Sequence, residues 1–154
     1  MFKWLMLLTA LLCGQAVADV KSALISATDI NAICPVADGG YQYRKGGFPM
    51  LEDKYAVTIT DNHCGFRIYQ QVFQLVGDHF ANDKLNNLLA AARQAGIPLV
   101  QDSRDKSLYV WQTQPGRYAL LGRKGKLVFD VFYAVDPQRE SSVRKLVLTK
   151  YNSL

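Results

Sequence analysis

Histidine and cysteine are scarce in this chain, which has two histidines, His63 and His79, and three cysteines in 154 residues. The histidines are 16 residues apart, and no third residue stands at a metal-binding spacing, so no metal ligands are expected. The glycine pairs at 39–40 and 46–47 lack the strand-loop-helix setting of a phosphate-binding loop. No nucleophilic serine motif surrounds either histidine. The sequence therefore predicts no catalytic residues and no cofactor, and an enzyme is the less favoured class.

Long apolar runs are also lacking, apart from Trp4 to Leu12 at the N-terminus. This run follows Lys3 and precedes Ala16-Val17-Ala18, the small-x-small pattern that a signal peptidase cleaves. It is shorter than the ~20 residues that cross a bilayer, and Leu12 is an unfavourable residue before Cys13 for a lipid anchor. We therefore expect a signal peptide at residues 1–18 and a soluble bacterial protein, periplasmic or secreted after cleavage near Ala18.

The remaining residues, 19–154, suit one domain. Within it only Cys34 and Cys64 are left, and in an oxidising compartment an even pair most simply forms a disulfide. The bond would close a loop of 31 residues and contribute roughly 3–4 kcal/mol. The alternative is a hydrolase in which a free Cys64 is activated by His79, with Asp78 as orienter.

Positive charge is concentrated in the last third of the chain. Residues 101–154 contain 10 basic and 5 acidic side chains, whereas residues 19–100 contain 7 and 8. Nucleic acid is not an expected partner of an exported protein. The expected partners are a protein of the cell envelope or an anionic envelope polymer or lipid.

The pattern of residues predicts an α+β domain with one or two helices packed on an antiparallel sheet. Residues 83–95 have the apolar period of a helix, and residues 54–60 are β-branched as in a strand. Residues 66–76 have the period of a helix and the propensity of a strand, so both alternatives stay open. Further strands are expected in a C-terminal meander, at residues 99–101, 107–112, 117–121, 126–135 and 143–151.

The segment from Asp38 to Pro49 is predicted to be an exposed loop because glycine pairs and a proline punctuate it. It combines aromatic and basic residues, which are typical anchors of protein interfaces. We expect its partner-binding residues to be Tyr41, Tyr43, Arg44, Lys45 and Phe48. The alternative is a surface loop whose aromatic side chains fold back onto the core.

The second candidate site is the basic turn that contains Arg123, Lys124 and Lys126, with Arg117 expected nearby across the hairpin. These cations could contact an anion, but charged turns also serve solubility and discourage edge pairing. The aromatic residues of the same region, Trp111 and Phe132 among them, are expected in the core or on a sheet face.

Together these features favour a small exported protein-binding module, such as an inhibitor, immunity or assembly factor. The alternative is an envelope-associating protein whose basic C-terminal third contacts anionic polymer or lipid. A Cys/His hydrolase is the third and least favoured hypothesis.

Overall fold

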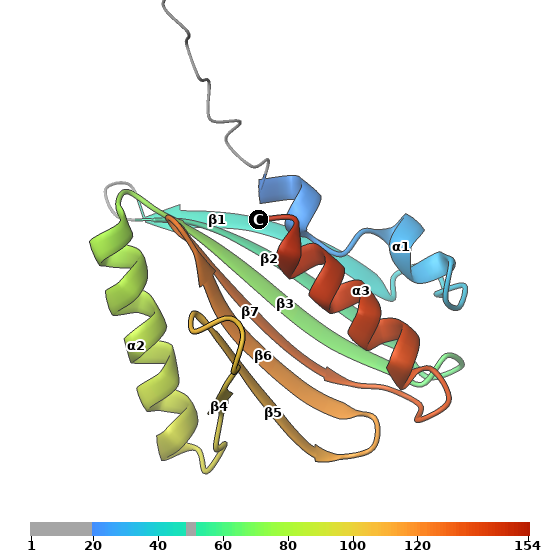
Figure 1. Cartoon of the computed structure of the whole chain (residues 1–154). Helices are drawn as coiled ribbons and strands as arrows, with labels where there is room; N and C mark the ends of the chain where they lie inside the picture. The colour runs from blue at the N-terminus through green and yellow to red at the C-terminus, as the bar shows by residue number, and fades with distance from the viewer. Residues whose placement is uncertain (1–19, 49–51) are drawn as a thin grey trace, which may run out of the picture.

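Seven antiparallel strands form one sheet in the computed structural model, which describes residues 20–48 and 52–154 (Figure 1). The strand order is β1-β2-β3-β7-β6-β5-β4. The strands are β1 (Tyr41–Phe48), β2 (Glu52–Asp61), β3 (Phe66–Leu75), β4 (Val100–Gln101), β5 (Leu108–Gln114), β6 (Arg117–Lys124) and β7 (Leu127–Ala134). The helices are η1 (Val20–Ala23), α1 (Ala27–Asn31), α2 (Asp78–Gln94) and α3 (Glu140–Asn152). The predicted α+β class with a C-terminal meander is confirmed.

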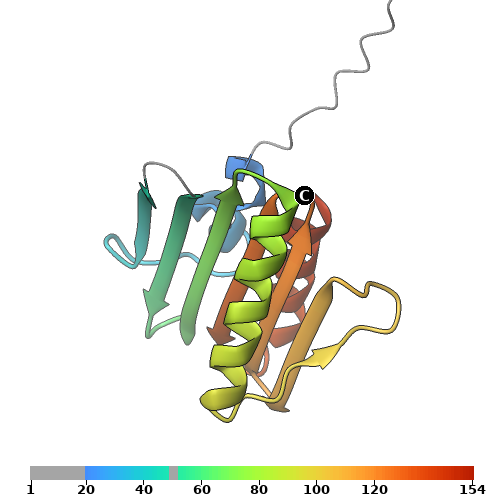
Figure 2. The ribbon, with the colours of Figure 1, turned by 90° about the vertical axis from the view of Figure 1, so that its left-hand side faces the viewer.

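The sheet is covered on both faces, α2 lying on one face and η1, α1 and α3 on the other (Figures 1 and 2). Side chains alternate between the two faces along each strand, so each face has its own core. The larger core joins the sheet to the N-terminal helices and α3, and includes Ile25, Ile68 and Phe129. The smaller core joins Phe73 and Val128 of the sheet to α2.

Residues 66–75, for which the sequence left two alternatives, form strand β3. One of the two adjacent glutamines that disturb the strand pattern, Gln70, has a structural role. Gln70 is fully buried, where its side chain accepts a hydrogen bond from Ile25 N–H (2.7 Å) and donates one to the Ala23 carbonyl (2.8 Å). A buried amide with both bonds made fixes the N-terminal segment against the sheet.

The prediction of a strand at residues 143–151 is wrong, because these residues belong to helix α3. Val143, Val147 and Tyr151 are fully buried, and their spacing of four residues places them on one face of the helix. Their β-branched and aromatic character favours a strand by propensity. Burial of this face against the sheet decides in favour of the helix.

The predicted disulfide between Cys34 and Cys64 is confirmed. It joins the segment after α1 to the turn between β2 and β3, so β1 and β2 lie within the closed loop. Among the described residues, no helix is long and apolar enough to cross a membrane.

Candidate functional site

Strand β1 is the outer strand of the sheet, and it occupies most of the segment predicted as a loop. The loop prediction is therefore wrong for residues 41–48, and Pro49 lies outside the described residues. Gly39, with a φ of +86°, provides the turn before the strand. Gly46 and Gly47 pair with Lys54 and Asp53 of β2, because continuous pairing with β2 outweighs the low strand propensity of glycine.

The backbone of β1 presents hydrogen-bonding groups to its outer edge. Thr60 N–H donates to the Gly40 carbonyl (2.8 Å), which shows that this carbonyl points inward, toward β2. Along an antiparallel strand these groups alternate in direction from one residue to the next. The residues whose N–H and C=O groups point outward are therefore Tyr41, Tyr43, Lys45 and Gly47.

Over residues 41–47 the side chains of β1 are exposed, except that of Tyr41, which is half-buried and donates a hydrogen bond to the Ile25 carbonyl (2.9 Å). Tyr43 is 45% exposed. Arg44 and Lys45 lie on opposite faces of the strand, and the Lys45 ammonium lies 5.5 Å from the centre of the Tyr55 ring. Phe48 ends the strand, and its side chain is outside the described part of the structure. Four of the predicted binding residues thus lie along one exposed edge.

The basic turn does not form the predicted group of four cations. Arg117 begins β6 and Lys124 ends it, so Arg117 lies at the opposite end of the hairpin, roughly 23 Å away at the rise of an extended strand. The Arg123 guanidinium donates to the Gly125 carbonyl (3.0 Å), and Lys126 is exposed.

Lys124 belongs to a polar cluster that the sequence did not reveal. The Asp105 carboxylate accepts hydrogen bonds from Lys124 Nζ (2.8 Å), Ser107 Oγ (2.5 Å) and the Tyr151 hydroxyl (3.0 Å). Burial raises the pKa of Asp105, but these hydrogen bonds together lower it well below the ordinary value. Burial also raises the pKa of Tyr151, to about 12. The cluster fixes the end of α3 to the β4–β5 connection.

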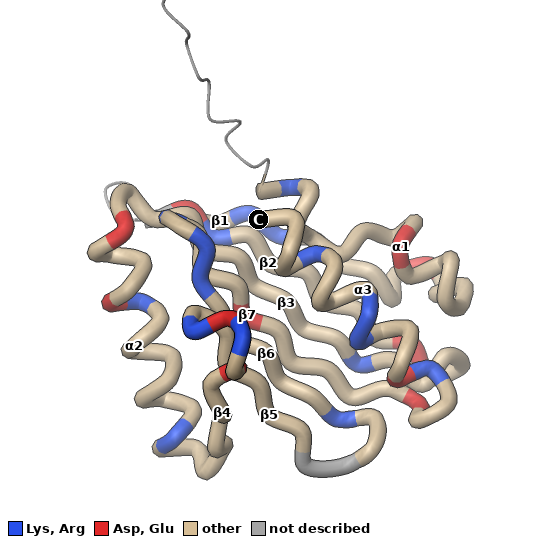
Figure 3. Tube along the Cα trace, in the orientation of Figure 1, with Lys and Arg blue, Asp and Glu red and all other residues tan. Residues whose placement is uncertain are grey.

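Other basic residues of the C-terminal third also form ion pairs within the protein. Arg144 forms an ion pair with Glu140 and lies over the Tyr118 ring, and Lys150 pairs with Asp29 (2.7 Å). Figure 3 shows basic residues on β1, α2, α3 and the β6–β7 turn, on several sides of the molecule. The structure does not gather the basic residues into one surface.

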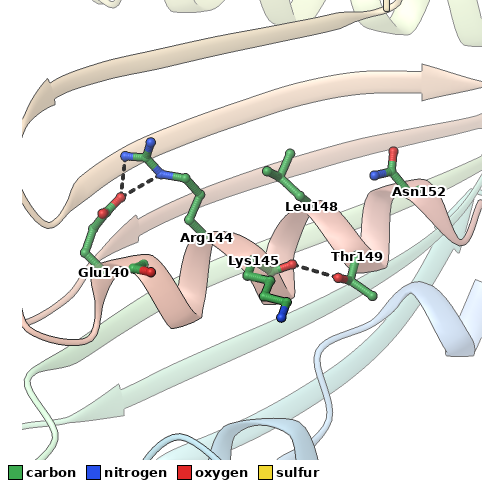
Figure 4. A pocket seen from close by; sticks show the side chains of 7 residues that line it. Glu140, Arg144, Lys145, Leu148, Thr149 and Asn152 are labelled. Carbon is green, nitrogen blue, oxygen red and sulfur yellow. Dashed lines mark hydrogen bonds and ion pairs between the residues drawn. The ribbon is translucent and has the colours of Figure 1, made fainter.

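A shallow groove runs along α3, with a volume of about 390 Å³ (Figure 4). The residues that line it, among them Glu140, Arg144, Leu148 and Asn152, all belong to this helix. Glu140 and Arg144 bind each other, and Thr149 Oγ1 donates to the Lys145 carbonyl (2.8 Å). With one helix as its only wall and with these polar groups already paired, the groove offers little to a ligand.

Cys64 and His79, the nucleophile and base of the hydrolase hypothesis, lie far apart in the structure. Cys64 is buried in the disulfide, and it lies before β3 whereas His79 lies after it. Ten residues of extended strand separate them by roughly 33 Å. The His79 side chain is 81% exposed, and its Nε2 lies 3.2 Å from the Asp83 carboxylate. No group of three potential metal ligands occurs in the part of the chain that the structure describes.

A cavity of about 220 Å³ lies between the C-terminal half of α2 and the sheet. Its walls are apolar, except for the half-buried carboxyl group of Asp130 on β7. The apolar wall residues include Leu88 and Ala92 of α2, Ile97 and Leu99 of the following connection, and Leu121 and Phe132 of the sheet. Burial raises the pKa of Asp130 to about 6, although attraction to Lys54 and Lys84 acts in the opposite direction.

Comparison of the sequence with models of known protein families and with curated proteins gives no match.

Proposed function

We propose that this protein is an exported protein-binding module, such as an inhibitor, immunity or assembly factor, which captures an extended segment of a partner protein along β1. The observation that carries the proposal is the open edge of this eight-residue strand. An exposed strand edge can bind a partner segment as an additional strand, with affinity from the backbone and specificity from the side chains.

The side chains of β1 suit an acidic partner segment. Arg44 and Lys45 project from the two faces of the strand, so acidic side chains on either face of an added strand would find a positive charge. Tyr43 adds a large exposed aromatic surface with a hydroxyl group at its tip. The opposite edge of the sheet is β4, which has two residues and offers little length for pairing.

The disulfide supports the exported location, because such bonds persist in oxidising compartments. It also limits the freedom of the loop that contains β1, which lowers the entropy lost when a partner binds. The signal peptide lies outside the described residues and stays a prediction.

The test is capture of partners from a cell-envelope extract by the C-terminally tagged protein at physiological and high salt. The decisive variant is Lys45→Pro, which removes an outward N–H and leaves the inward pairing of β1 with β2 intact. Its matched control is Lys45→Ala, which removes the charge but keeps the N–H.

We expect one stoichiometric protein that survives high salt, is retained by Lys45→Ala in reduced amount, and is lost with Lys45→Pro. Circular dichroism should show that both variants are folded. Equal capture by the wild type and a folded Lys45→Pro variant would refute binding along β1. Capture of glycan or lipid alone, lost at high salt, would support the envelope-associating alternative.

A further inference from the structure

We propose that the cavity between α2 and the sheet binds a small apolar amine, whose hydrocarbon part fills the cavity and whose ammonium group contacts the Asp130 carboxylate. The cavity shares no residue with β1, so this inference is independent of the proposed function.

The volume of the cavity sets the size of the ligand. A protein cavity of about 150 Å³ with walls of leucine, isoleucine and phenylalanine can bind benzene. A volume of about 220 Å³ therefore has room for one six-membered ring with a short tail. Phe132, which lines the cavity, is 38% exposed, so the cavity lies at the surface.

The carboxyl group of Asp130 determines the chemistry of the ligand. Its register neighbours in the sheet are Gln71 and Leu121. Burial and the attraction of two lysines act on its pKa, and no hydrogen bond to a described residue does. With a pKa of about 6 the group is ionised at pH 7.5. A half-buried carboxylate without a hydrogen-bond donor is unfavourable, and a cationic N–H group would relieve that cost.

The two lysines whose charges act on Asp130 place their ammonium groups over an aromatic ring. The Lys84 ammonium lies 4.2 Å from the centre of the Phe73 ring, and the Lys54 ammonium lies 5.5 Å from it. Both positive charges lower the pKa of Asp130 by electrostatic attraction. An amine bound in the cavity would bring its N–H groups to the carboxylate of Asp130, which lines the same cavity as Leu88 and Phe132.

Phenethylamine is a suitable probe because it combines one ring with a two-carbon tail and an ammonium group. Its control is 2-phenylethanol, which has similar size and no charge. Binding is followed by NMR of the ¹⁵N-labelled protein at pH 7.5. The indole N–H of Trp111 is a useful signal, because Trp111 pairs with Ala119, which lines the cavity.

We expect saturable binding of phenethylamine in the low-millimolar range or tighter, and binding of the alcohol about tenfold weaker. Asp130→Asn should remove this difference. Ala92→Phe should fill the cavity and abolish binding, whereas Ala90→Phe, at an exposed position of the same helix, should retain it.

Absence of phenethylamine binding would overturn the proposal. Equal affinity for the amine and the alcohol, or unchanged amine affinity in Asp130→Asn, would overturn the role of the carboxylate. Unchanged binding in a folded Ala92→Phe variant would overturn the location. Thermal melting of each variant establishes that it is folded.

Discussion

Replacement of Asp105 by asparagine should destabilise the protein by about 2–3 kcal/mol at pH 7, because hydrogen bonds to a charged group contribute roughly 1.5–3 kcal/mol. The carboxylate accepts bonds from Lys124, Ser107 and Tyr151, and asparagine keeps the shape but loses the charge. The expected loss of stability corresponds to about one such hydrogen bond, although the carboxylate accepts three. The side chains of Asp105 and Lys124 are 27% and 35% exposed, so solvent screens their attraction.

The loss should depend on pH. Because the hydrogen bonds outweigh the effect of burial, the pKa of Asp105 is lower in the folded protein than its ordinary value of 3.8. A carboxyl group of this kind contributes its full stability above the unfolded pKa, and the contribution falls as the pH approaches the folded pKa. A contribution of about 2–3 kcal/mol at pH 7 should therefore fall to about half at pH 3.

The assay is urea unfolding of the wild type and Asp105→Asn at both pH values. A double-mutant cycle with Tyr151→Phe tests whether the two side chains act together, since the loss of the hydroxyl group should cost less once Asp105 is replaced. An equal loss of stability at pH 7 and pH 3 would refute the argument that the ionised carboxylate holds the cluster.

Three further predictions concern stability. Asp130→Asn should stabilise the protein by about 1–2 kcal/mol at pH 8 and have little effect at pH 3.5. The pKa of Asp130 is higher in the folded than in the unfolded protein, so the ionised carboxylate lowers the stability of the wild type above the unfolded pKa. Equal unfolding curves of the two proteins at pH 8 would contradict this prediction. Gly122→Ala should cost about 1–3 kcal/mol, because its β-carbon would overlap the Tyr151 ring, whereas Gly46→Ala meets no atom and is the control in thermal melting. Joint replacement of Cys34 and Cys64 by alanine should lower the free energy of unfolding by about 3–4 kcal/mol, because the disulfide closes a loop of 31 residues. An unchanged midpoint in denaturant would contradict this contribution of the closed loop to stability.

The sequence predicts the strands well where propensity and burial agree. The β-branched run at 54–60 lies within β2, and the predicted helix at 83–95 corresponds to α2, which begins at Asp78 and ends at Gln94. The two wrong secondary-structure predictions, a strand at residues 143–151 and a loop at residues 41–48, have one cause. In α3 and in β1 the local propensity opposes the structure, and contacts with distant parts of the chain decide the outcome.

The candidate sites cannot be predicted from the sequence without knowledge of how the strands pair in the sheet. All five predicted binding residues lie on β1, but this strand follows from the pairing with β2, and the glycine pairs in the sequence suggested a loop instead. Asp105 and Tyr151 are 46 residues apart, and no local pattern joins them. Asp130 is one of 13 acidic residues in the sequence, and only the packing of α2 on β7 places it beside an apolar cavity.

The strand order has a consequence for folding. The strands β1, β2 and β3 form one local unit, the strands from β4 to β7 form another, and only the pairing of β3 with β7 joins the two in the sheet. That seam brings together Gln74 and Leu127, which are 53 residues apart, so its closure carries a large entropic cost. We therefore expect the two units to form early and to dock late. Two fragments of the chain, divided in the connection at residues 95–99, should accordingly reassemble by pairing β3 with β7. Helix α2 belongs to the first fragment and packs on strands of both.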